Sequence, residues 1–325
     1  MKNALVISGG GAKGAFAVGA FEHLREQNLT FDLVAGTSTG ALIAPLVATD
    51  DVALLRYIYT SVRNEDIILS RDLLNVLTHD AIYDTNPLWS LINSFVNRER
   101  YEKILASAVE VFLATVNLQT GGIEYWNPRT GGPGGTALDL RTFQRAMMAS
   151  ASMPVLMPPI TILEGGAQHV DGGVREIAPL KVAIDHGATD LYAILLTPAQ
   201  HEPKSDRYVF LVKTLLRSID LFTQEVLAND LATALVYNQA VRHRETLRAK
   251  ATKLLTKQQV KALFADPANP DPFAGKRLLN LYVIRPQEEL PVDSLQFSPV
   301  AMSQIMTLGG EAARRALAAG PVLSL

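Results

Sequence analysis

One five-residue segment, Gly36-Thr37-Ser38-Thr39-Gly40, constrains the fold of this chain more than any other. The run before it, FDLVA, has the length and composition of a buried strand, and the run after it, ALIAPLVA, is long enough to begin a helix. Glycines on both sides of the turn relieve the crowding of a sharp change from strand to helix, which lifts the serine hydroxyl above the sheet. The segment therefore predicts a strand–turn–helix unit with Ser38 at the turn.

Strand-like and helix-like runs alternate through the first half of the chain, which predicts parallel strands joined by crossover helices. The predicted strands are Ala4–Ser8, Leu33–Gly36, Val109–Asn117, Leu191–Leu196 and Leu279–Ile284, with a hairpin of Ile160–Leu163 and Gln168–Val170. The predicted helices are Ala15–Gln27, Thr39–Thr49, Asp51–Ser94, Leu140–Ser150, Pro179–Gly187, Ser205–Phe264 and Val300–Ala319. Since a strand returns after the long helical stretch, we expect a core over 1–200, a helical insertion over 201–275, and a strand and helix over 276–325 that complete the core.

Composition excludes several classes of function. The 325 residues contain no cysteine, so disulfides, thiolate metal sites and cysteine nucleophiles are ruled out. The net charge of −2 gives no overall attraction to nucleic acid, and histidines and carboxylates lack metal-binding spacing, so no metal or other cofactor is expected. Without a signal peptide or a span of about 20 apolar residues, we expect a soluble, cytoplasmic protein. Nothing in the sequence indicates an oligomeric state.

A glycine loop, Gly9-Gly10-Gly11-Ala12-Lys13-Gly14, follows the first predicted strand and precedes a helix. Backbone N–H groups in such a loop can converge on one anion, and the helix dipole adds to their effect. The spacing also satisfies GxGxxG, but a dinucleotide site needs an acidic residue at the end of the second strand, where this chain has Gly36-Thr37-Ser38. A tight turn without a ligand is the remaining alternative for this loop.

A nucleophilic serine needs a base, which is usually a histidine oriented by a carboxylate. None of the six histidines follows a strand as a base of that kind would, and we expect His169 to have a structural role. Asp171 in Val170-Asp171-Gly172-Gly173 is the better candidate, because it ends a strand and two glycines after it allow close approach.

In this order, GGGAKG at 9–14, GTSTG at 36–40 and DGG at 171–173 resemble the patatin-like phospholipases, and residues 149–159 (ASASMPVLMPP) extend the likeness. The resemblance implies a three-layer α/β/α fold with a mostly parallel sheet, and a serine hydrolase of lipid acyl esters. It further implies that Ser38 is the nucleophile, that Asp171 is its partner, and that Gly9, Gly10 and Gly11 form the oxyanion hole. Two positions depart from the common pattern: Lys13 stands where arginine is frequent, and Ile177 where asparagine is.

Two other functions remain open at this stage. The same acyl-enzyme could transfer its acyl group to an alcohol or thiol, and the fold could serve a catalytically silent lipid-binding protein. Basic residues gather in Arg242–Lys261, where Lys250, Lys253, Lys257 and Lys261 recur at helical spacing; this segment is either a peripheral membrane contact or a solvated face. The apolar stretch Tyr208–Phe222 predicts either a lid over the acyl chain or a core helix. Four methionines, Met147, Met148, Met153 and Met157, could line an acyl pocket or fill the core.

Overall fold

The first strand is buried on both of its faces, and this determines the layers of the molecule. Leu5 and Ile7 are buried in one hydrophobic core, and Ala4 and Val6 are buried in a second core on the opposite face of the sheet. Successive side chains of a strand point to opposite faces, so a strand buried on both faces must lie between two layers of helices. The computed structural model describes the chain except for residues 72–79, 201–206, 265–270, 272, 274 and 323–325.

The central sheet has the strand order β10-β9-β1-β2-β5-β8-β7, with β6 paired to β5. Neighbours are parallel from β10 to β5, while β6 and β8 run antiparallel to β5 and β7 runs antiparallel to β8. The carboxyl ends of β1 and β2 meet at one edge, so the residues after both strands share that edge. The strands are β1 Asn3–Ile7, β2 Leu33–Thr37, β5 Glu110–Asn117, β6 Ile123–Trp126, β7 Ile160–Thr161, β8 Gln168–Asp171, β9 Asp190–Ile194 and β10 Asn280–Ile284.

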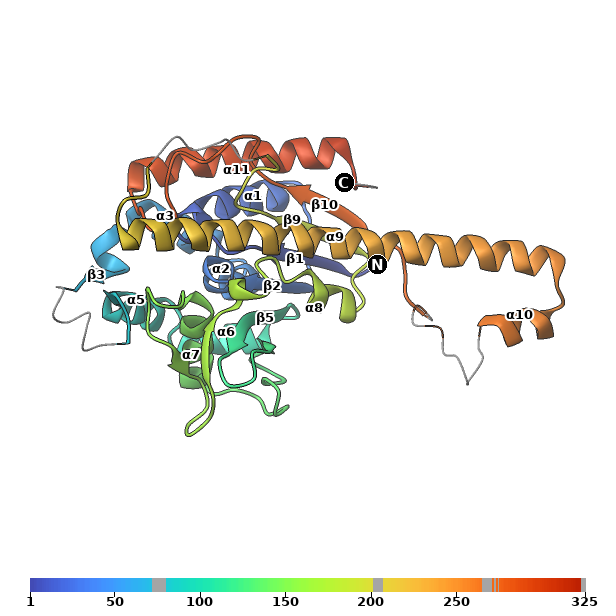
Figure 1. The fold of residues 1–325 in the computed structure, drawn as a ribbon, viewed down its shortest axis with the longest axis horizontal. Coiled ribbons are helices and arrows are strands. Elements are labelled where there is room, and N and C mark those ends of the chain that lie inside the picture. Colours follow the sequence, from blue (N-terminus) through green and yellow to red (C-terminus); the bar gives the residue numbers. More distant parts are fainter. Residues whose placement is uncertain (72–79, 201–206, 265–270, 272, 274, 323–325) are drawn as a thin grey trace.

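Helices cover both faces of this sheet (Figure 1), so the predicted three-layer α/β/α fold is confirmed. The first core takes side chains from α1 Gly14–Glu26, α2 Thr39–Ala48, α3 Val52–Ser61, α5 Asn86–Phe95, α6 Arg98–Ala106, α7 Leu140–Ala151 and α11 Pro299–Ala319. The second core takes them from α8 Leu180–Asp185 and from part of α9 Leu211–Leu254. Short 3₁₀ turns are η1 Gly11–Lys13, η2 Asn64–Asp66 and η3 Gly172–Val174, and α10 is Lys257–Phe264.

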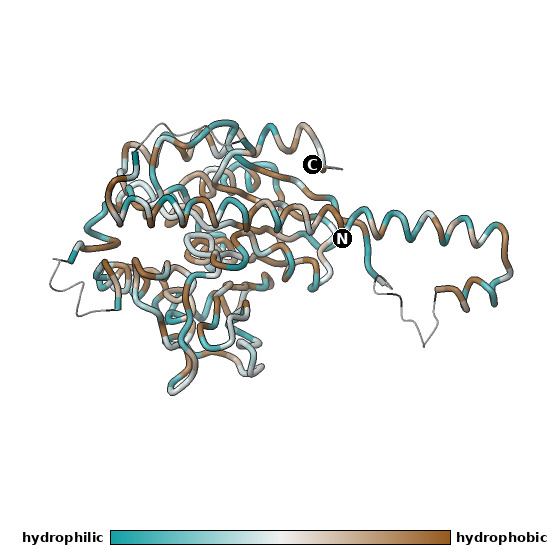
Figure 2. Tube along the Cα trace, viewed as in Figure 1, coloured by the Kyte–Doolittle hydropathy of each residue, from teal (hydrophilic) through white to brown (hydrophobic). Residues whose placement is uncertain are grey.

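The long helix α9 has 44 residues and, at about 1.5 Å per residue, is roughly 66 Å long. Its middle turns pack on the sheet through buried side chains such as Leu227, Leu231 and Leu235. Val241 is the last buried residue of α9, and beyond it the helix runs past the body of the molecule (Figure 1). Polar and apolar residues mix along that projecting end (Figure 2).

Three predictions of secondary structure were wrong. The stretch 51–94 is not one helical region, because α3 ends at Ser61 and a small antiparallel pair, β3 Leu69–Ser70 with β4 Tyr83–Asp84, precedes α5. Helix α6 and strand β6 were missed. The basic segment Arg242–Lys261 is not one helix either, since it is broken between the end of α9 at Leu254 and the start of α10. The division of the chain at residues 200 and 275 stays a prediction, although β10 pairs with β9 inside the central sheet.

Candidate active site

Ser38 occupies the turn between β2 and α2 in a strained backbone conformation, with φ 57° and ψ −124°. Positive φ is uncommon for a residue with a side chain, and it is the conformation that a sharp strand-to-helix turn imposes on a nucleophile. A Cβ at Gly36 would lie 2.2 Å from the carbonyl oxygen of Gly40, and a Cβ at Gly40 would lie 2.2 Å from that of Ile7. Glycine is therefore required on both sides of the turn, as the sequence motif indicates.

A buried hydroxyl of α7 holds the backbone of Ser38. The Ser38 N–H donates to Oγ of Ser150 at 3.1 Å, and the Ser150 hydroxyl donates to the carbonyl of Ala114 at 2.6 Å. Sequence reasoning did not assign Ser150 a function. The run ASASMP contained the signal, since it was singled out by the family resemblance but not linked to the turn at Ser38.

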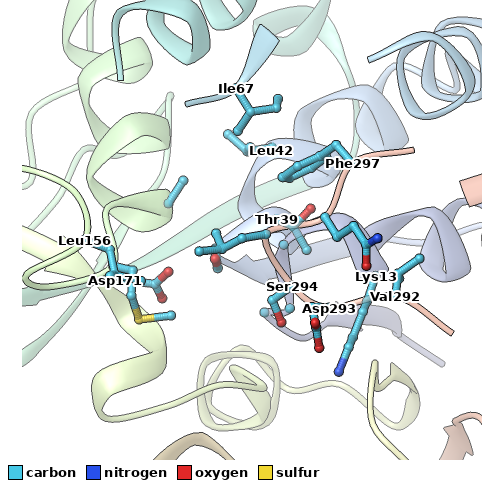
Figure 3. Close-up of a pocket in the computed structure, with 18 of the residues that line it drawn as sticks. Lys13, Thr39, Leu42, Ile67, Leu156, Asp171, Val292, Asp293, Ser294 and Phe297 are labelled. Atoms are coloured by element: carbon cyan, nitrogen blue, oxygen red, sulfur yellow. The ribbon is translucent and has the colours of Figure 1, made fainter. Parts of the chain in front are cut away.

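Asp171 ends β8, and its side chain is almost fully buried. Oδ1 accepts a hydrogen bond from the N–H of Gly173 at 2.7 Å. Among the described residues, Oδ2 has no hydrogen-bond partner. The carboxylate points into the same pocket that Ser38 lines (Figure 3), so the structure brings the predicted nucleophile and its predicted partner together.

Burial raises the pKa of the Asp171 carboxyl to about 6, because desolvation penalises the charged form. The Ser38 hydroxyl and the Gly173 amide both oppose this rise by stabilising the carboxylate. The hydroxyl is thus near enough to affect the carboxyl, yet the two side chains do not have the geometry of a hydrogen bond. A carboxyl with this pKa is ionised at neutral pH and is a stronger base than an exposed aspartate.

The glycine loop lies directly against Ser38, since a Cβ on Gly9 would be 3.0 Å from the Ser38 Cβ. The Gly9 N–H already donates to the carbonyl of Ile177 at 3.0 Å, so it could serve an oxyanion only if this bond were shared or broken, and its oxyanion role stays a prediction. Within the part of the chain that the structure describes, the N–H groups of Gly10 and Gly11 donate to no protein acceptor. These two amides are therefore the donors that remain for an anion beside Ser38.

The outer side of this loop is closed by a segment near the other end of the chain. The Ala12 N–H donates to the carbonyl of Ser294 at 2.9 Å. Gly11 has φ +56°, and a Cβ there would lie 1.9 Å from the same carbonyl oxygen. The segment 289–297 is thus part of the site, although nothing in its sequence indicated this.

Ser38, Asp171 and the glycine loop line one cavity of about 980 Å³. Its volume lies at the upper end of the range of about 300–1,000 Å³ that is typical of small-molecule sites. Most of its wall is apolar, and Figure 3 shows Leu42, Ile67 and Phe297 on one side of it and Lys13, Asp293 and Ser294 on another. The apolar lining from α2, α3, α5, α7 and α9 includes Leu42, Leu46, Leu55, Ile58, Leu88, Leu91, Ile92, Phe95, Met147, Leu216, Ile219 and Leu227.

Two groups of residues left open by the sequence can now be located. Met147, Met153 and Met157 line the cavity, whereas Met148 is buried in the core outside it. The first turns of α9 contribute Leu216 and Ile219 to the cavity wall, while Phe222 on the same helix is 69% exposed. Part of the apolar stretch Tyr208–Phe222 therefore borders the cavity.

No histidine lines the cavity in the described part of the chain, and His79 and His201 lie outside the described residues. Nε2 of His169 is 2.7 Å from a carboxylate oxygen of Glu124, and its ring meets that of Trp126 edge-on. Its contacts are those of a structural residue, as predicted. No group of three possible metal ligands occurs among the described residues, and no helix in the ranges searched is long and apolar enough to cross a membrane.

Comparisons with known proteins identify similar sequences and structures. Residues 5–184 match the family model described as "Patatin-like phospholipase". The chain is 30% identical over 226 residues to the uncharacterized protein YqhO of Bacillus subtilis, a match that covers 62% of this chain and 74% of YqhO. It is 29% identical over 191 residues to lysophospholipase nte1 of Aspergillus oryzae, covering 58% of this chain and 11% of that protein. With human patatin-like phospholipase domain-containing protein 6 it shares 27% identity over 199 residues, covering 59% and 13% of the two chains.

The chain thus spans only about an eighth of the length of these last two relatives. Among solved structures it is similar to VipD from Legionella pneumophila, with a TM-score of 0.43 and 14% identity over 98% of this chain and 67% of VipD.

Proposed function

Because the chain belongs to the patatin-like phospholipase family, we propose that it is a serine hydrolase that cleaves fatty-acyl ester bonds of lipids through Ser38 and Asp171. The observation that carries the proposal is that Asp171 lines the same apolar cavity as Ser38 and that its Oδ2 has no hydrogen-bond partner in the described part of the chain. A buried carboxylate oxygen without a hydrogen-bond partner is costly unless a ligand or a reacting group completes it. Lipid esters are the substrates of this family, and the cavity offers apolar surface for an acyl chain.

The proposed reaction has two halves. Asp171 takes the proton of the Ser38 hydroxyl as Oγ attacks the ester carbonyl carbon, and the N–H groups of Gly10 and Gly11 donate to the oxyanion. The intermediate then collapses: the bond to the alcohol breaks, and the alcohol leaves with the proton held by Asp171. In the second half, Asp171 takes a proton from water, the hydroxide attacks the acyl-serine, and the fatty acid leaves as Ser38 regains its proton.

We expect the protein to release free fatty acid from a panel of phosphatidylcholine, lysophosphatidylcholine and diacylglycerol, measured by mass spectrometry. A lysophospholipid belongs in the panel because one relative is named a lysophospholipase. A fluorophosphonate probe is expected to label Ser38, and a chelator is expected to leave the rate unchanged. Absence of both fatty acid and label would refute the proposal. If an added alcohol received most of the acyl groups, the activity would be transfer instead of hydrolysis.

We further propose that the projecting end of α9, together with α10, contacts anionic membranes. Lys250, Lys253, Lys257 and Lys261 are exposed there. Large apolar side chains are exposed beside them, with Leu254 82% and Leu263 63% accessible. Basic and apolar side chains that are exposed together on a helical segment favour an interfacial position, with the charges near lipid headgroups.

Changing Lys253, Lys257 and Lys261 to Glu is expected to weaken binding to vesicles that contain phosphatidylserine by about 100-fold, since each basic residue near such a surface contributes about 1 kcal/mol. Vesicle flotation measures this. The matched control changes Arg98, Arg141 and Arg314 to Glu, three exposed arginines elsewhere that alter the net charge equally. Equal binding by the two triple variants would show that the projecting end is only a solvated surface.

A further inference from the structure

The segment of Glu176 and Ile177, which follows η3, contacts both the end of β2 and the glycine loop. The hydroxyl of Thr37, which precedes the proposed nucleophile, donates to the carbonyl of Glu176 at 3.0 Å. The next carbonyl, that of Ile177, accepts the hydrogen bond from the Gly9 N–H at 3.0 Å. Adjacent carbonyls of residues 176 and 177 therefore hold the end of β2 and the start of the glycine loop.

The side chain of Ile177 fills the space between the same elements. Its Cδ1 lies 2.6 Å from where a Cβ on Gly9 would be, and equally 2.6 Å from where a Cβ on Gly173 would be. Ile177 also lines the cavity. Because Ile177 leaves no room for a side chain at either glycine, it packs between them, and a displacement of Ile177 changes the packing of the glycine loop, of the turn after Asp171, or of both.

The amide side of this segment is held by a residue of α9. Oδ2 of Asp230 accepts hydrogen bonds from the N–H groups of both Ile177 and Ala178, each at 3.0 Å. Burial raises the pKa of Asp230 to about 7, with a contribution from the nearby carboxyl of Glu176, while the two amides oppose the rise. Asp230 lies outside the family match at residues 5–184, so this contact is made by a part of the chain that the family model does not cover.

We propose that Asp230 is a positioning residue, which holds the peptide of Ile177 so that the glycine loop and the Ser38 turn keep their catalytic geometry. The inference rests on the proposed function, because it assigns a purpose to that geometry. The chain of contacts is continuous: Asp230 accepts from the Ile177 N–H, and the Ile177 carbonyl accepts from the Gly9 N–H. The next two residues, Gly10 and Gly11, have N–H groups that donate to no acceptor among the residues that the structure describes. Catalytic groups misplaced by about 1 Å can lose about 100-fold in rate, so loss of this anchor reduces turnover without removing a reacting group.

The test compares Asp230→Ala, Asp230→Asn and Glu225→Gln in the full chain, with p-nitrophenyl butyrate as the substrate. Glu225→Gln is the matched control, because Glu225 is exposed on the same helix and bonds only to Asn229 among the described residues. We expect Asp230→Ala to lower kcat by about 30- to 100-fold per folded molecule, with KM changed less than about threefold. Asp230→Asn retains an oxygen that can accept from both amides, so it is expected to keep kcat within about fivefold of the wild type.

The results distinguish a wrong positioning role for Asp230 from a wrong hydrolase function. If Asp230→Ala matches Glu225→Gln in kcat while the wild type turns over with Ser38 intact, the positioning role is wrong and the function stands. If the activities of Asp230→Ala and Asp230→Asn fall only in proportion to the fraction of folded protein, measured by thermal unfolding, the positioning role is also wrong. If Asp230→Ala does not fold, Asp230→Asn decides, since a loss of kcat greater than about 30-fold without a change in stability contradicts the oxygen-acceptor role. No Ser38-dependent turnover in the wild type would overturn both proposals.

Discussion

Replacing Ser38 by alanine is expected to reduce fatty-acid release at least about 10⁴-fold, because the attacking oxygen is removed and the remaining groups can only assist water. The substitution should leave the fold intact. Alanine keeps the Cβ that contacts Gly9, and the Ser38 N–H that donates to Ser150 belongs to the backbone. The measurement is initial rate on the preferred lipid, together with labelling by a fluorophosphonate probe.

Ser303→Ala is the control for this variant, since Ser303 is exposed on α11 and, among the described residues, its hydroxyl bonds only to the carbonyl of Pro299. Its rate and labelling are expected to equal those of the wild type. If the Ser38 variant kept more than about a hundredth of the rate, the acyl-enzyme mechanism would have to be abandoned. Labelling that persisted in it would place the reactive group at another residue.

Asp171→Asn is expected to lower kcat about 10³-fold, within the range of about 10²- to 10⁴-fold for loss of a general base. In the wild type, kcat/KM should rise with pH and level off above pH 6, because burial raises the pKa of Asp171 to about 6 and the base must be ionised. Asparagine cannot take the serine proton at any pH. The residual rate of the variant is therefore expected to lack this rise, and pH–rate profiles of both proteins test it.

The same substitution is expected to make the protein more stable. A carboxyl whose pKa is higher in the folded state destabilises the fold as it ionises, so the penalty is absent below about pH 4 and complete above pH 6. A rise in the pKa of Asp171 from 3.8 to about 6 corresponds to a free-energy cost of about 3 kcal/mol for the ionised carboxyl in the folded protein. Asparagine removes that cost, and its side-chain oxygen can still accept from the Gly173 N–H. We expect urea unfolding at pH 8 to show Asp171→Asn more stable by about 1–3 kcal/mol, with little difference at pH 4.

Asp50→Asn is the control for Asp171→Asn, because it makes the same chemical change at an exposed carboxylate that is paired with Arg25. Exposed pairs of this kind contribute about 0–1 kcal/mol, so its stability at pH 8 should be unchanged or slightly lower. Its activity should equal that of the wild type. A less stable Asp171→Asn at pH 8 would mean that the carboxylate is favoured in the folded protein, contrary to the direction of its pKa.

Features that depend on neighbours in sequence could be predicted. The turn at Ser38 follows from two glycines, an apolar run before it and a longer one after it, and the structure has β2 and α2 at those places. The secondary structure between Asp51 and Ser94 was harder to predict, because its apolar residues have helical spacing and few residues mark where one helix ends and the next begins. Pro87 in the first turn of α5 was a usable signal for a new helix. Asn97 was a second such signal, since its side chain caps α6 by accepting from the Arg100 N–H at 3.0 Å.

The parts of the site that the sequence did not reveal come from distant contacts. Asp230 is one of several carboxylates on a long helix, and only the tertiary fold puts it against residues 177 and 178. Gly9 shows the same limit inside a motif. It belongs to the glycine motif, but its N–H is used by Ile177, and no local pattern distinguishes it from Gly10 or Gly11. The motifs therefore indicated which loops line the cavity, but not which of their N–H groups the fold already uses.

The hydrogen bond between Ala12 and Ser294 has a consequence for a chain that is still being made. A ribosome adds about 5–20 residues per second, so the glycine loop leaves it more than about 10 s before the segment that closes its outer side. Until then the loop lacks the carbonyl of Ser294, and β9 lacks its partner β10. A nascent chain therefore carries Ser38 before it carries a finished cavity, and the cavity wall beside Ser38 is complete only once the segment 289–297 has been made.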